Sequence, residues 1–168
     1  MSSRKSLKNI RLVVYDFDGV MTDNKVLLRE DGTESVVVNR SDGLAVSYLK
    51  KAGLPQVIIT TEKNPVVRAR ARKLGIPVMR GAEDKKSVML SYCRRHGIGP
   101  EEVAYIGNDL NDLSAMQCVG FPLCPADACP EVRRVSLIVL KARGGEGVVR
   151  EFFGLLSGQK RSSNGNAR

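Results

Sequence analysis

The sequence has no tryptophan, and aromatic residues make up only 5% of its 168 residues. Aromatic platforms on which bases could stack are therefore not evident, which argues against a nucleic-acid partner. The longest apolar runs have the length of strands, so no segment is long enough to cross a membrane. The N-terminal stretch MSSRKSLKNI lacks the apolar core of a secretion signal. We therefore expect a cytoplasmic protein with no membrane partner.

The four cysteines lack the spacing of a disulfide framework or a zinc site. Cys93, Cys118, Cys124 and Cys129 include no C-x-x-C pair. We interpret them as thiols in a reducing compartment, in agreement with a cytoplasmic location.

Positive charge is in excess, and most of this excess lies at the two ends of the chain. Six of the nine net charges come from the acid-free tails. A nucleic-acid role would therefore rest on the tails alone and would show steeply salt-dependent binding. The remaining excess gathers in RARARK, residues 68–73. This run is either a solvated helix face or a rim that attracts an anionic substrate.

The chain length suits one domain, which we place at residues 10–157 between a flexible N-terminus (1–9) and a disordered tail (158–168). Strand-like and helix-like segments alternate within it. We expect strands at 11–15, 56–60, 76–79, 102–106, 120–123 and 136–140, and helices at 42–52, 64–73, 85–97, 110–118, 128–133 and 146–156. This alternation predicts an α/β fold, a Rossmann-like parallel sheet with helices on both faces.

Residues 25–38 break this alternation. They contain two β-rich runs on either side of Asp31-Gly32, a dipeptide suited to a hairpin turn. We therefore expect a β-hairpin flap after the first strand, placed where it could cover a site.

Two carboxylates follow the first predicted strand. The apolar run at residues 12–15 stops at Asp16 and Asp18, and ligands of open α/β sheets bind beyond the carboxyl ends of strands. Two like charges held there need a cation or a proton between them. Mg²⁺ prefers oxygen ligands and completes its shell with water and substrate phosphate. The motif therefore predicts metal-assisted chemistry on a phosphate, with one carboxylate free to act as nucleophile.

Three further polar positions occur at strand or helix ends. Thr60 ends the strand VIIT, Lys85 opens a helix, and GNDLND (107–112) follows the strand VAYI. Each alone could be a cap, a turn or a surface charge. Together and in this order they predict a single site.

These motifs resemble those of the haloacid dehalogenase (HAD) superfamily of phosphotransferases, over residues 10–156. The similarity is greatest to its capless sugar-acid phosphatases, which act on 3-deoxy-octulosonate 8-phosphate or 2-keto-3-deoxynononate 9-phosphate. The C-terminal domain of N-acylneuraminate cytidylyltransferases also looks like this chain. The stretches that carry the resemblance include DFDGV, AYIGND, PADA (125–128) and GGEGVVREF (144–152).

The resemblance implies a role for each motif. Asp16 would attack phosphorus and form an aspartyl-phosphate. Asp18 would protonate the leaving oxygen, activate water and bind Mg²⁺ through its backbone carbonyl. Thr60 would donate a hydrogen bond to a phosphoryl oxygen, and Lys85 would neutralise the transferring group.

The fourth motif departs from the Gly-Asp-Asp of many relatives, because Asn108 and Asp109 follow Gly107. Either residue could supply the third metal ligand. We favour Asp109, with Asp16 and Asp18 as the other two. Asn108 would then lie beside the metal or the substrate. We expect Asp112 to orient Lys85 or a metal-bound water.

Substrate choice is predicted from the residues after Thr60. Octulosonate phosphatases typically have Gly-Arg there, whereas this chain has Thr61-Glu62. Together with Arg70 and Lys73, Glu62 resembles the nononate group, in which these positions contact the sugar acid. An arginine can bind a keto-acid carboxylate through two hydrogen bonds. The alternative is that Arg70 and Lys73 form a solvated helix face.

The GGEG segment (144–147) either starts the last helix, with Glu146 in its first turn, or closes over the substrate. The resemblance also implies a homotetramer in which hairpins form a central barrel. We therefore predict a Mg²⁺-dependent phosphatase of a nine-carbon 2-keto sugar-acid 9-phosphate. The alternatives are the eight-carbon 8-phosphate as substrate, or a non-catalytic tetramerisation module. A phospho-accepting receiver domain fits poorly, because the Asp pair follows the first strand.

Overall fold

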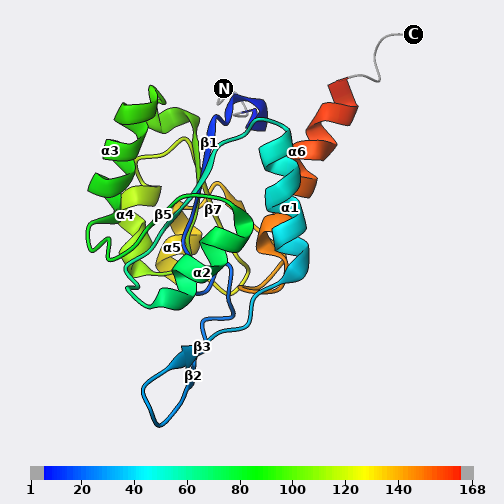
Figure 1. The fold of residues 1–168 in the computed structure, drawn as a ribbon. Coiled ribbons are helices and arrows are strands. Elements are labelled where there is room, and N and C mark those ends of the chain that lie inside the picture. Colours follow the sequence, from blue (N-terminus) through cyan, green and yellow to red (C-terminus); the bar gives the residue numbers. More distant parts are fainter. Residues whose placement is uncertain (1–5, 164–168) are drawn as a thin grey trace.

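The computed structural model describes residues 6–163, with side chains up to residue 158. Its centre is a sheet of six parallel strands in the order β5-β4-β1-β6-β7-β8 (Figure 1). The strands are β1 (Leu12–Tyr15), β4 (Gln56–Ile59), β5 (Val78–Met79), β6 (Val103–Ile106), β7 (Phe121–Cys124) and β8 (Ile138–Val139). Four of them are almost entirely buried, as parallel strands covered on both faces must be. The predicted α/β fold is confirmed.

Helices cover both faces of this sheet and form two hydrophobic cores. The helices are α1 (Arg40–Lys51), α2 (Pro65–Leu74), α3 (Lys85–His96), α4 (Leu113–Met116), α5 (Pro130–Val135) and α6 (Val148–Ser163). One core packs α1, α2 and α6 against the side chains on one face of the sheet, among them Val13 and Tyr15. The other joins α3, α4 and α5 to Leu12 and Val14. The period-two alternation of the strands thus supplies both cores.

The register of the central strands brings the predicted site loops together. Tyr15, the last residue of β1, pairs with Ile58 of β4 and Ile106 of β6. The loops after these strands therefore leave neighbouring positions on one edge of the sheet, where ligands of open α/β folds bind.

The predicted flap is a two-stranded antiparallel hairpin of β2 (Leu27–Leu28) and β3 (Glu34–Ser35). Its turn contains Gly32 at φ +79°, a value that favours glycine. The hairpin projects away from the body of the molecule, from the edge at which the central strands end (Figure 1).

The ends of the domain differ from the sequence prediction. Leu7–Asn9 form a short 3₁₀ helix, and Leu7 is buried in a core although residues 1–9 were expected to be flexible. Helix α6 continues to Ser163, beyond the predicted boundary at 157. The buried side chain of Leu7 orders the first segment. Residues 1–5 and 164–168 of the predicted tails lie outside the described part of the chain.

Two further 3₁₀ turns, Pro100–Glu102 and Leu110–Asp112, flank β6. The second replaces the start of the helix predicted at 110–118, because Asp109 and Asp112 bond backbone amides there. Within the described residues, no helix combines the length and apolar character needed to cross a bilayer.

Candidate active site

Asp16 directly follows β1 and is buried at the edge of the sheet where the central strands end. Its Oδ1 accepts a hydrogen bond from the Phe17 amide at 2.8 Å and lies 2.9 Å from Lys85 Nζ. Burial raises the pKa of Asp16 to about 8, with a further increase from the Asp112 charge and opposition from Lys85. A carboxylate held ionised here therefore needs positive charge beside it.

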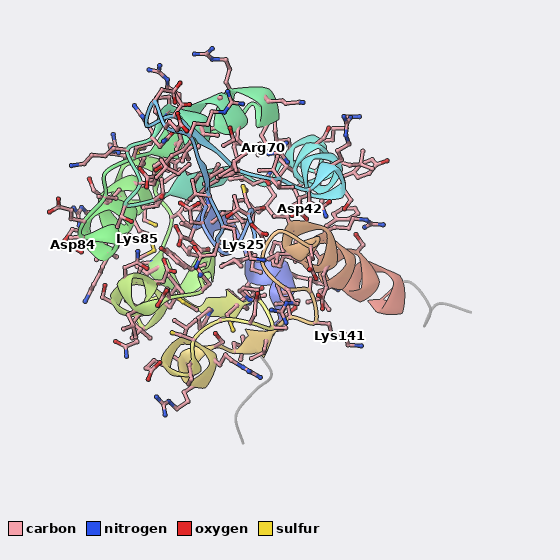
Figure 2. The ribbon with its side chains drawn as sticks, turned by 90° about the horizontal axis from the view of Figure 1, so that it is seen from below. Lys25, Asp42, Arg70, Asp84, Lys85 and Lys141 are labelled. Carbon is pink, nitrogen blue, oxygen red and sulfur yellow. The ribbon has the colours of Figure 1, made fainter. Side chains whose placement is uncertain are left out.

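Lys85 supplies part of that charge from the first position of α3. Its Nζ contacts Asp16 Oδ1 and also Asp112 Oδ1, at 2.7 Å. Burial lowers the pKa of Lys85, but Asp16 and Asp112 more than offset this effect and leave the pKa raised. Lys85 is therefore a fixed cation. Figure 2, viewed from below, shows the Lys85 side chain at the start of α3.

Asp112 links Lys85 to the loop after β6. Its Oδ1 also accepts from the Tyr105 hydroxyl at 2.9 Å, and its Oδ2 accepts from the Asn108 amide at 2.9 Å. The sequence prediction that Asp112 could orient Lys85 agrees with these contacts. Tyr105 was not foreseen, because its strand position marked it only as a core residue.

The loop after β1 places Asp18 beside Asp16. Gly19 has φ +81°, and a Cβ there would overlap the Asn108 amide. Thr22, which the sequence analysis missed, accepts from the Gly19 amide at 3.2 Å and donates to Asp18 Oδ1 at 3.5 Å. Burial raises the pKa of Asp18, and the Glu62 charge raises it further.

The side chain of Asn108 faces the two aspartates. One terminal atom of its amide lies 2.9 Å from the Asp18 carbonyl oxygen and 3.2 Å from Asp16 Oδ2. If this atom is the amide oxygen, it lies beside two further oxygens, and an oxygen-only donor set suits a divalent cation such as Mg²⁺. Adjacent ligands around Mg²⁺, with bonds of about 2.0–2.1 Å, lie about 2.9 Å apart. The donor set fits a magnesium ion.

Asp109, the metal ligand favoured from the sequence, has a different environment. Its carboxylate is on an exposed residue and accepts from the Leu110 amide at 2.7 Å, where it caps a 3₁₀ turn. Among the described residues, no three acidic, histidine or cysteine side chains form a group that could hold a metal ion. The geometry therefore favours Asn108 over Asp109 as the third metal ligand, because the backbone after β6 directs the Asn108 side chain toward Asp16 and Asp18.

The site opens into a cavity of about 390 Å³, a volume typical of small-molecule sites. Its lining residues are Asp16, Asp18, Asn24, Thr60, Thr61, Asn108, Asp109, Leu110 and Asn111. Thr60 Oγ1 accepts from the Glu62 amide at 3.0 Å, so its hydroxyl hydrogen can be donated to a ligand. The aspartates, Thr60, Thr61 and Asn108 are thus brought together as the sequence predicted.

Glu62 lies close enough to Asp18 to raise its pKa, and its Oε1 accepts from the Lys63 and Asn64 amides at 2.7 and 2.8 Å. Asn64 in turn donates to Glu34 of the hairpin at 2.8 Å. This link between the hairpin and the loop after β4 joins residues 30 positions apart, so no local sequence signal could have revealed it.

Arg70 and Lys73 do not line the cavity. Arg70 donates to the Asn39 carbonyl at 2.9 Å, and its neighbouring charge is Asp42 (Figure 2). Lys73 is exposed in the last turn of α2. Within this chain both therefore fit the alternative of a structural or solvated helix face, because α2 docks on α1 with Arg70 turned toward that helix.

The GGEG segment packs against the loop after β1. The Gly145 amide donates to the Val20 carbonyl at 3.1 Å, and a Cβ on Gly144 would overlap the Gly19 carbonyl oxygen. Helix α6 begins at Val148, so Glu146 precedes the helix, contrary to the alternative that placed it in the first turn. The glycines provide the close backbone approach that holds this loop in place.

Comparisons with known proteins agree with this geometry. A model of the haloacid dehalogenase-like hydrolase family matches residues 30–120. The 3-deoxy-D-manno-octulosonate 8-phosphate phosphatases of Escherichia coli K12 and Yersinia pestis are 34% and 35% identical to this chain. Their alignments cover 89% and 88% of this chain and 80% of each relative.

Solved structures give the same picture. A protein of Streptomyces avermitilis assigned to the HAD hydrolases is 44% identical, with a TM-score of 0.89 over 94% of this chain and 97% of that chain. The 3-deoxy-D-manno-octulosonate 8-phosphate phosphatase of Moraxella catarrhalis, crystallised with magnesium, phosphate and KDO, is 33% identical. Its TM-score is 0.88, over 94% of this chain and 92% of that chain.

Proposed function

This chain belongs to the haloacid dehalogenase-like hydrolase family, and we propose that it removes phosphate from a 2-keto-3-deoxy sugar-acid phosphate. It is a phosphoric monoester hydrolase that uses Mg²⁺. One observation carries the proposal. Asp16 has Lys85 on one carboxylate oxygen, while its other oxygen belongs to the set that fits a divalent cation.

In the proposed reaction Asp16 is the nucleophile. Its carboxylate oxygen forms a bond to phosphorus while the bond from phosphorus to the sugar oxygen breaks, giving an aspartyl-phosphate. Lys85 stabilises the negative charge of the transferring group, because its ammonium is held 2.9 Å from Asp16. Asp112 keeps Lys85 charged and in position.

Asp18 is the proposed acid and base. It gives a proton to the leaving sugar oxygen and then takes one from the water that attacks the aspartyl-phosphate, which releases phosphate and restores Asp16. Burial and Glu62 raise the pKa of Asp18, which favours the protonated form needed in the first step. Thr60 donates its hydroxyl hydrogen to a phosphoryl oxygen.

We assign the metal ligands to Asp16, the Asp18 carbonyl and Asn108. When bound there, Mg²⁺ supplies positive charge that aligns the phosphate and lowers the cost of ionising Asp16. Asn108 contributes an uncharged oxygen, and Asp109 remains a cap of the neighbouring turn.

The eight-carbon 3-deoxy-octulosonate 8-phosphate is the better-supported substrate, because the named relatives act on it. This reverses the order expected from the sequence. The nine-carbon 2-keto-3-deoxynononate 9-phosphate remains the second candidate on one observation, the presence of Glu62 beside Asp18. Glu62 is not among the residues that line the cavity, but it follows Thr60 and Thr61, which are, and a carboxylate there can accept hydrogen bonds from the hydroxyls of a longer sugar.

We also propose that the enzyme works as a homotetramer assembled through its hairpins. Leu27 and Leu28 are 65% and 66% exposed, and Val37 is 77% exposed. A two-stranded hairpin is at best marginally stable alone, and exposed apolar patches mark contact sites. Arg70 and Lys73 would then contribute to substrate binding only through such an assembly.

The cytoplasm remains the proposed compartment. All four cysteines are free, which supports a reducing environment.

The decisive experiment is a phosphate-release assay with both sugar-acid phosphates, with and without Mg²⁺. Wild type should release phosphate only with Mg²⁺. Asp16→Asn should lose all but about a thousandth of the turnover, because its amide is a poor nucleophile. Its circular dichroism spectrum should match that of wild type. Wild-type inactivity on both substrates, or turnover by Asp16→Asn, would refute the proposal.

A further inference from the structure

We propose that the Asn108 side chain is a two-way ligand, which rests on the magnesium site proposed above. Its NH₂ group donates to the site oxygens when no cation is bound, and its carbonyl oxygen joins the cation when one is. The residue would then stabilise the metal-free protein as well as hold the metal.

The partners of the amide carry this proposal. The atom that points inward lies 2.9 Å from the Asp18 carbonyl oxygen and 3.2 Å from Asp16 Oδ2. The Asp18 carbonyl oxygen is an acceptor at any pH, and Asp16 Oδ2 is an acceptor whenever the Asp16 carboxyl is ionised, a state that its contact with Lys85 favours. An inward NH₂ therefore makes two hydrogen bonds, whereas an inward oxygen makes none and repels both neighbours.

A bound Mg²⁺ reverses this preference. The two separations match the spacing of about 2.9 Å between adjacent ligands of an octahedral Mg²⁺ shell. The same three positions can therefore hold a cation once the amide presents its oxygen. No backbone movement is needed, since the amide only exchanges its two ends.

The surroundings of Asn108 permit that exchange. The final torsion of an asparagine side chain is broad and roughly two-fold, so both orientations are accessible. The amide lies against Gly19, where any Cβ would overlap it. The backbone of Asn108 stays fixed meanwhile, because its amide donates to Asp112 Oδ2 at 2.9 Å and its carbonyl accepts from Cys129.

An aspartate at this position could not do both. Without a cation its carboxylate would face Asp16 Oδ2 with no hydrogen to donate, and the two like charges would repel. With a cation it would add one negative charge and bind more tightly. The asparagine therefore trades magnesium affinity for stability of the metal-free enzyme.

Two variants separate the parts of this proposal. Asn108→Asp should lower the melting temperature of the EDTA-treated protein by several degrees, because repulsion replaces two hydrogen bonds. In calorimetric titration it should bind Mg²⁺ about tenfold more tightly or better. Asn108→Ala should lower both the melting temperature and the Mg²⁺ affinity.

The matched control is Asn111→Asp. This residue lines the same cavity but is exposed, and its amide reaches only Thr61 at 3.5 Å. The same change of charge there should leave the metal-free melting temperature within about a degree of wild type, since surface changes are usually small.

Nuclear magnetic resonance gives a readout that does not depend on activity. In ¹⁵N-labelled protein, the side-chain NH₂ signal of Asn108 is assigned as the one that is present in wild type and missing in Asn108→Asp. This signal should exchange slowly with water in EDTA and shift when Mg²⁺ is added.

The outcomes distinguish this proposal from the proposed function. If wild type takes up no Mg²⁺ at millimolar concentration, the magnesium site and this proposal both fail. If wild type binds Mg²⁺ but Asn108→Asp neither destabilises the metal-free protein nor tightens binding, only the two-way ligand is overturned. An Asn108 NH₂ signal that is unchanged by Mg²⁺ would also overturn it.

Discussion

Lys85 and Asp112 form an ion pair with no exposed side-chain surface, and Lys85 Nζ lies 2.7 Å from Asp112 Oδ1. The pair joins α3 to the loop after β6 and fixes the position of the Lys85 ammonium beside Asp16. We therefore expect stability and the proposed catalysis to depend on the same two side chains.

Asp112→Asn should weaken both properties. The change leaves Lys85 buried with one carboxylate fewer, and removing one partner of a buried pair costs about 3–5 kcal/mol. Denaturant unfolding should show a loss of that order, and turnover should fall about a hundredfold as Lys85 loses its alignment. Tyr105→Phe is the control, because it removes one hydrogen bond to the same oxygen and should cost only about 1 kcal/mol. Equal losses in the two variants would contradict a special role for the ion pair.

Glu62→Arg should change the choice between the two sugar-acid phosphates. Replacing an acceptor of hydroxyl hydrogen bonds by a cation should move the ratio of kcat/KM about tenfold toward the eight-carbon substrate. Glu62→Gln is the matched control, because its amide oxygen can still accept from the Lys63 and Asn64 amides. An unchanged ratio in Glu62→Arg would mean that Glu62 does not select the substrate.

Charged residues on the hairpin should dissociate the assembly. The double variant Leu27→Asp, Leu28→Asp would bring like charges together at the proposed contact. Light scattering after size exclusion should show a tetramer for wild type and a smaller mass for the double variant. Val139→Asp, at an exposed apolar position on β8, should keep the wild-type mass. A monomeric wild type would rule out this assembly.

Asp42 should make stability fall as pH rises. Burial raises its pKa above the usual 3.8, although the Arg150 and Val149 amides and Arg70 oppose this. The folded state therefore binds the proton more tightly than the unfolded state. The contribution of Asp42 is full below the unfolded-state pKa and is lost as pH rises through the folded-state pKa. Each tenfold difference in proton affinity between the two states contributes about 1.4 kcal/mol.

Asp42→Asn should remove this pH dependence, because an amide does not titrate. Its amide oxygen can still accept from the backbone amide of Arg150, so the hydrogen bond is kept. Unfolding measured from about pH 4 to about pH 8 should fall less steeply in the variant than in wild type. Asp31→Asn is the control, because hydrogen bonds from Thr33 lower the pKa of exposed Asp31 and its contribution is lost only at lower pH, so its slope over this range should match that of wild type. Parallel pH profiles for wild type and Asp42→Asn would contradict the assignment.

The sequence predicted the fold well where the signal was local. Alternating apolar strands and amphipathic helices indicated the parallel sheet, and Asp31-Gly32 marked the hairpin turn that the structure contains. These features depend on residues close together in the chain.

Prediction was weaker where the answer depended on which way a side chain turns. Asn108 and Asp109 are adjacent and both polar, and only the backbone path after β6 decides which faces Asp16. Arg70 was predicted to bind substrate on the family resemblance, yet the docking of α1 against α2 directs it to the Asn39 carbonyl. Asp42 reads as an ordinary residue of a helical first turn, but its partner Arg150 lies 108 positions away.

The hydrogen bond from Asn64 to Glu34 ties the exposed hairpin to the loop that carries Thr60 and Glu62. If neighbouring copies hold that hairpin, the same contact steadies the mouth of the cavity. Specific activity would then depend on protein concentration, and very dilute samples would lose turnover before they lose their fold.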